Sequence, residues 1–115
     1  MNEASPAVTD QSSPLPPTRN AAVLRCCAAR ESSLRESRAK NRDNYDTKKF
    51  ANYAYCDAMP DLSGHENIRD FIACVAHGMV TGVIDAIEGP KFLYAAQVAI
   101  GALRREPKDQ KPSAA

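Results

Sequence analysis

The sequence predicts an all-α protein whose best-defined part is an antiparallel helical hairpin over about residues 63–105. Two runs of apolar residues at helical spacing predict it: one extends from Ile68 to Ile87, and the other is KFLYAAQVAIGALRRE. Between them, Gly89 suits the left-handed position after a helix, and Pro90 suits the first turn of the next helix. The two helices are therefore expected to be joined by a tight turn and to lie side by side.

The ends of the hairpin carry recognisable capping signals. Ser63 and Glu66 fit a capping box, in which the serine oxygen accepts the amide of Glu66 and the glutamate reaches back to the serine amide. At the other end, Arg104 and Arg105 suit the negative end of a helix dipole. These signals favour a helix start at residue 63 and a helix end near residue 105.

A short aromatic helix is expected before the hairpin. The segment TKKFANYAYCDAM follows Asp46, which can cap it, and is followed by Pro60, which ends it. Phe50 and Tyr53 lie on one side of this helix, so we expect that side to pack on the hairpin.

The chain before this helix is basic and has little to bury. Residues 20 to about 40 favour a helix, but past Cys27 the only large apolar residue among them is Leu34. We expect a marginal basic helix that acts as a connector.

These patterns divide the chain into four parts. The two ends are rich in proline and polar residues, so burial cannot offset the entropy lost on ordering them. The predicted parts are a disordered arm at 1–18, the basic connector at 19–45, a small helical domain at 46–106 and a disordered tail at 107–115.

Composition excludes several classes of protein. Four cysteines, two of them adjacent, do not make a disulfide scaffold, and the N-terminus lacks the basic and apolar segments of a signal peptide, so we expect a reducing cytoplasm. The longest apolar stretches, 71–84 and 92–103, are shorter than the roughly 20 residues that span a bilayer. We expect no membrane insertion.

The net charge of +1 hides blocks of opposite sign. Residues 19–49 carry nine bases against four acids, whereas residues 57–89 carry one base against six acids. Such blocks favour pairing within the molecule or between copies. Nucleic-acid binding by the basic segment is the alternative. Its candidate residues are Arg25, Arg30, Arg35, Arg38, Lys40 and Arg42.

A polar stripe along the first hairpin helix holds the candidate chemistry. Asp70, Cys74 and His77 stand at i, i+4 and i+7, a spacing that aligns a carboxylate, a thiol and an imidazole that can ligate zinc. A fourth ligand would have to come from elsewhere, so a partly exposed histidine on the polar side is the favoured interpretation. Catalysis by the cysteine would also need an orienting group and an oxyanion hole, so we expect neither an enzyme nor a cofactor.

The apolar surface of the hairpin predicts association. The apolar arc of the first helix covers around 200°, more than the roughly 100° that one partner helix needs, and the second helix is apolar almost all round. We therefore expect a protein–protein interaction module that forms a homodimer or docks a partner. The expected interface residues are Phe71, Val75, Gly78, Met79, Gly82, Val83, Leu93, Ala96, Ile100 and Leu103.

Overall fold

The protein is all-helical, as predicted, in the part of the chain that the structure describes. The computed structural model describes residues 20–105, and the predictions for 1–18 and 107–115 lie outside them. The helices are α2 (Ala21–Ala39), α3 (Asn44–Asp57), α4 (Gly64–Thr81) and α5 (Glu88–Arg104). The antiparallel hairpin expected over about 63–105 is confirmed as α4 and α5.

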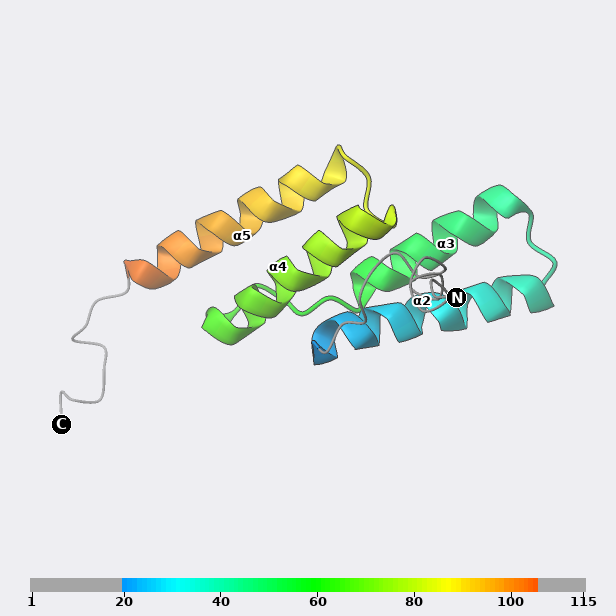
Figure 1. The fold of residues 1–115 in the computed structure, drawn as a ribbon, viewed down its shortest axis with the longest axis horizontal. Helices are drawn as coiled ribbons and strands as arrows, with labels where there is room; N and C mark the ends of the chain where they lie inside the picture. The colour runs from blue at the N-terminus through cyan, green and yellow to red at the C-terminus, as the bar shows by residue number, and fades with distance from the viewer. Residues whose placement is uncertain (1–19, 106–115) are drawn as a thin grey trace, which may run out of the picture.

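The four helices form two hairpins that pack against each other. Helix α2 packs along α3, and α4 packs along α5, so in Figure 1 the α2–α3 pair lies on the right and the α4–α5 pair lies on the left. The two pairs meet where α2 contacts α4. Among the described helices, α5 packs only against α4, so it lies at one edge of the molecule.

Helix α2 is longer and more regular than a marginal connector, because it buries small residues. The Asn20 side chain caps it by accepting from the Val23 amide at 3.1 Å. Ala22, Val23 and Cys26 are almost fully enclosed. Near its end, the buried Ser37 hydroxyl accepts a hydrogen bond from Arg42 at 2.9 Å. Small side chains allow two helices to approach closely and so stabilise their packing. Counting only the large apolar residues of α2 overlooks this stabilisation.

The aromatic helix α3 packs mainly on α2, and its Tyr55 side chain reaches the second hairpin. Asp43 caps it by accepting from the Asp46 amide at 2.7 Å, so the prediction of an Asp46 cap was wrong by one turn. Tyr55 is 1% exposed, and its hydroxyl donates to the Cys74 carbonyl at 2.7 Å. This residue connects α3 to the core of the second hairpin.

The turn between α4 and α5 differs from the prediction. Helix α4 ends at Thr81, because Gly82 takes the left-handed conformation (φ 82°) that was expected of Gly89. Ile84 then turns inward and is 4% exposed, with its amide donating to the Gly78 carbonyl at 3.0 Å. Gly89 is instead a buried residue of α5, covered by Met79.

The capping box predicted at Ser63 and Glu66 does not form. Ser63 is the N-cap residue of α4, but its hydroxyl donates to the Asp61 carboxylate at 2.9 Å and makes no cap hydrogen bond. Gly64, the next residue, has a φ of 80°.

Candidate functional site

The three candidate residues on the polar stripe of α4 lie at the seam with α2. The Asn20 amide donates to the Asp70 carboxylate at 3.1 Å. Cys26 and Cys74 have their sulfur atoms 3.6 Å apart. The sulfur of Cys27, the next residue along α2, lies 3.8 Å from Nε2 of His77.

His77 is partly exposed, as expected, but the middle of the polar stripe is covered rather than open to solvent. Cys74 is fully buried, and Asp70 and His77 are partly buried, because α2 covers the stripe. Cysteine behaves as a small hydrophobic residue, so a helix-wheel count that groups it with carboxylates misplaces it. The sequence feature that could have identified α2 as the covering helix is its adjacent pair of cysteines, Cys26 and Cys27.

The seam places two thiols in contact and does not gather a metal-ligand set. Among residues 20–105, no group of three or more His, Cys, Asp or Glu side chains is placed to hold a metal ion. The adjacent Cys26 and Cys27 project in different directions around α2, toward Cys74 and His77 respectively. The chemistry available at the seam is therefore that of a thiol pair beside a thiol–imidazole contact.

The thiols at the seam are held in their protonated form. Burial raises the pKa of Cys26 to about 12. Burial also raises the pKa of Cys74, and the hydrogen bond donated by Cys26 partly opposes that increase. The pKa of Tyr55, against the same cluster, is raised by burial as well. At neutral pH the side chains of Cys26, Cys74 and Tyr55 are therefore uncharged.

We expect the protein to lose stability in alkali because of this seam. The folded pKa of Cys26 is about 12 against 9.0 for an unperturbed thiol, so the unfolded chain binds fewer protons in that interval. The stability is fully present below about pH 9 and falls as pH rises through the folded pKa. Facing the thiol are Cys27 and Arg25 on α2, Cys74 on α4 and Tyr55 on α3; only Arg25 favours the thiolate.

The measurement is the urea midpoint of unfolding between about pH 8 and pH 10.5. The midpoint of the native chain should fall with pH more steeply than that of Cys26→Ala, measured in the presence of a reductant. Parallel pH profiles for the two proteins would contradict the assignment to Cys26.

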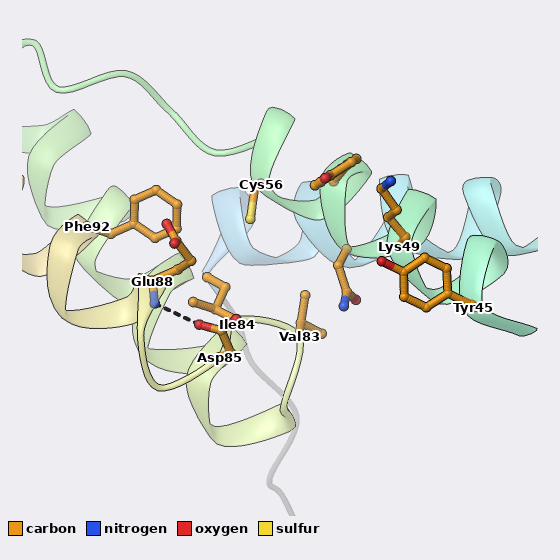
Figure 2. Close-up of a pocket in the computed structure, with 10 residues that line it drawn as sticks. Tyr45, Lys49, Cys56, Val83, Ile84, Asp85, Glu88 and Phe92 are labelled. Carbon is orange, nitrogen blue, oxygen red and sulfur yellow. Dashed lines mark hydrogen bonds between the residues drawn. The ribbon is translucent and has the colours of Figure 1, made fainter.

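A groove of about 550 Å³ separates α3 from the segment that joins α4 to α5. Figure 2 shows Tyr45 and Lys49 on the α3 side, with Glu88 and Phe92 on the opposite side. The Lys49 ammonium lies 5.8 Å from the ring centre of Tyr45 and 5.9 Å from that of Tyr53. The groove thus presents a cation between two aromatic rings and faces acidic residues across the gap.

One acidic residue of this groove serves the fold. The carboxylate of Asp85 accepts from the amides of Ile87 at 2.9 Å and Glu88 at 2.7 Å, and the second bond is drawn in Figure 2. This residue therefore caps the start of α5. Because these two amides already occupy the Asp85 carboxylate, it is less able to bind a ligand in the groove.

The residues expected to form an interface are divided between the core and the surface. Phe71, Val75, Gly78 and Ala96 are enclosed within one chain. Met79, Val83, Ile100 and Leu103 are partly buried against that core, whereas Leu93 is 36% exposed and Gly82 is exposed. The face of α5 that was expected to associate is therefore the one that packs on α4.

The opposite side of α5 carries apolar residues that the sequence reasoning missed. Ile87 is 69% exposed, Tyr94 is 68% exposed and Val98 is 50% exposed. They belong to a stripe with alternating spacings of four and three residues, a pattern visible in the sequence. We call this stripe the outer α5 face; it consists of Ile87, Lys91, Tyr94, Val98, Gly101 and Arg105.

The basic residues of the nucleic-acid alternative do not form one basic face. Arg30 lies 4.0 Å from Glu31, Lys40 lies 2.9 Å from Glu36, and Arg42 stacks over Phe50 at 4.3 Å. Arg25, Arg35 and Arg38 are exposed. At 100° per residue, however, the directions of Arg25 and Arg38 differ by about 140°. The geometry gives this alternative no added support.

Comparisons of this chain with protein-family models, with curated proteins and with solved structures find no match. Within residues 20–105, no helix has both the length and the apolar character needed to cross a bilayer.

Proposed function

We propose that this chain is a protein–protein interaction module that self-associates through the outer α5 face. The observation that carries the proposal is the position of α5: it is apolar on nearly all sides, yet in the described part of the chain it packs only against α4 (Figure 1). Its outward side leaves Ile87, Tyr94 and Val98 in water. Covering contiguous apolar side chains is the main driving force for association.

The spacing of the outer α5 face suits a second helix of the same kind. Steps of four and three residues repeat along it, as in the seam of a coiled coil. In an antiparallel pair related by a two-fold axis at the level of residue 96, Tyr94 of one copy meets Val98 of the other. Lys91 then lies opposite Gly101, and the Arg105 side chain that lies beside this glycine has to move aside in the pair.

Charge favours the antiparallel orientation. Glu88 begins α5, and Arg105 follows its last turn on the outer face. In the antiparallel pair, Arg105 of one copy is level with Ile87 of the other and lies one residue along the axis from Glu88, at both ends of the interface. The two helix dipoles also oppose each other in this arrangement, whereas parallel packing would place like ends together.

Substituting the central aromatic residue is expected to abolish self-association. Tyr94→Glu places one carboxylate from each copy in the middle of the paired surface, with Lys91 one turn away as the nearest cation on this face. Desolvation of the two carboxylates should weaken the dimer by at least ~100-fold. Sedimentation equilibrium over a concentration series measures the dissociation constant. The matched control is Val80→Glu, since Val80 on α4 is 66% exposed against 68% for Tyr94 and lies off the outer α5 face.

The orientation can be checked with the same assay. Glu88→Arg places like charges together at both ends of the antiparallel pair and should weaken it about tenfold, while Glu88→Arg combined with Arg105→Glu should restore most of the affinity. A native chain that remains monomeric at high protein concentration would overturn the proposal. A dimer that both Tyr94→Glu and Val80→Glu leave intact would exclude this face.

We extend the proposal to a reducing cytoplasm and to a role without catalysis. The four cysteines are free thiols in the structure, a state that a reducing compartment preserves. The thiols at the α2–α4 seam are enclosed and carry little thiolate at neutral pH, so they react slowly, as expected of a role without catalytic turnover.

A further inference from the structure

Two thiols from different helices meet at the contact between α2 and α4, where the two hairpins join. Cys26 belongs to α2 and Cys74 to α4, and their sulfur atoms are 3.6 Å apart in a fully buried position. A disulfide needs a sulfur–sulfur distance of about 2.05 Å. The sulfurs must therefore approach by about 1.5 Å, a change within reach of side-chain rotation and a small helix shift.

We propose that Cys26 and Cys74 are a dithiol oxidation site that takes a hydroperoxide as its oxidant and forms a disulfide across the α2–α4 seam. The inference is independent of self-association through α5. It assigns these two buried thiols a modification that joins residues 48 positions apart in the sequence.

The reaction balances as two thiols plus one hydrogen peroxide giving one disulfide and two waters. The Cys74 sulfur accepts the hydrogen bond from Cys26, so its thiolate is the better stabilised of the two. In the small fraction of molecules that carry this thiolate, its sulfur attacks one peroxide oxygen, the O–O bond breaks, and a sulfenic acid forms, while the proton lost from the Cys74 thiol converts the leaving hydroxide to water. The Cys26 sulfur then attacks the Cys74 sulfur, the S–O bond breaks, and the second water leaves with the proton of Cys26.

The arrangement selects this pair over the other cysteines. Cys27 is adjacent to Cys26 on one helix, a geometry that disfavours a bond between them, and its sulfur faces His77. Cys56 lines the groove beside α3, away from the seam. The contact between Cys26 and Cys74 is also the one sulfur–sulfur hydrogen bond among the described cysteines.

The test uses the full chain with Cys27→Ser and Cys56→Ser, which leaves the proposed pair as the two remaining cysteines. After treatment with hydrogen peroxide, we expect a monomeric species on a non-reducing gel with a mass about 2 Da lower, reversed by dithiothreitol. We also expect the thermal midpoint to rise by roughly 5–15 °C, because the bond closes a long loop. Adding Tyr94→Glu should leave the bond unchanged, which separates this result from self-association.

A second set of variants tests the pairing in the otherwise native chain. Cys74→Ala should lose the intramolecular disulfide, whereas Cys56→Ser should keep it, with both proteins first checked for helix content by circular dichroism. Stepwise gain of oxygen at Cys26 and Cys74 without the mass loss would overturn the proposal. A disulfide that maps to Cys27 or Cys56 in the native chain would overturn it as well.

Discussion

Tyr55→Ala is expected to unfold much of the protein at 25 °C. Tyr55 is 1% exposed and is the largest enclosed side chain, and it connects α3 to α4 across the molecule. Truncation of a buried aromatic residue costs about 3–5 kcal/mol, and the total stability of a domain this small is of similar size. Urea unfolding followed by circular dichroism gives the free-energy change, provided that a folded baseline remains.

Two variants separate the contributions of the ring and the hydroxyl. Tyr55→Phe keeps the packing and removes the hydrogen bond to the Cys74 carbonyl, so it should cost about 1–2 kcal/mol. Tyr53→Ala is the matched control, because Tyr53 lies two residues away on the same helix and is 56% exposed. If Tyr53→Ala and Tyr55→Ala were equally destabilising, α3 would not pack as described.

Gly78→Val is the second substitution with a large expected effect. A Cβ atom at Gly78 would lie 2.7 Å from Cδ1 and 2.9 Å from Cγ1 of Ile84, and 3.2 Å from the ring of Tyr55. Ile84 cannot retreat without leaving the core, so valine should cost about 2–3 kcal/mol through overpacking, although glycine itself is unfavourable inside a helix.

The control for this substitution is Ala76→Val on the same helix. Ala76 is exposed, so valine there should change the unfolding free energy by less than about 0.5 kcal/mol. Differential scanning calorimetry of the two variants compares their thermal midpoints. A gain in stability for Gly78→Val would show that Ile84 does not pack behind the glycine.

The fold class could be predicted because the dominant signals are local. The repeat of apolar residues in α4 and α5 identifies the hairpin, and Pro90 correctly falls in the first turn of α5. The boundary between the two helices could not be placed, because two glycines compete for the left-handed position. Gly82 takes it because Ile84 then enters the core, a tertiary preference that local capping rules do not contain.

The sequence predicted only the α4 half of the candidate site. Asp70, Cys74 and His77 were found by their spacing on one helix, and the structure brings Asn20, Cys26 and Cys27 against them from a segment about 50 residues away. A helix-wheel projection sorts residues by polarity and cannot tell which neighbour a thiol will meet. This is why a stripe assigned to solvent forms a helix contact.

The division of the helices into two hairpins also has a consequence for the order of folding. Contacts within each hairpin join residues close in sequence, whereas those across the α2–α4 seam join residues 48 to 50 positions apart. Loop closure makes such distant contacts slower to form. Each hairpin should therefore assemble early as a local unit, and docking of the pair should be the late step, so that amide protons along α2 and α4 gain their full protection from exchange last.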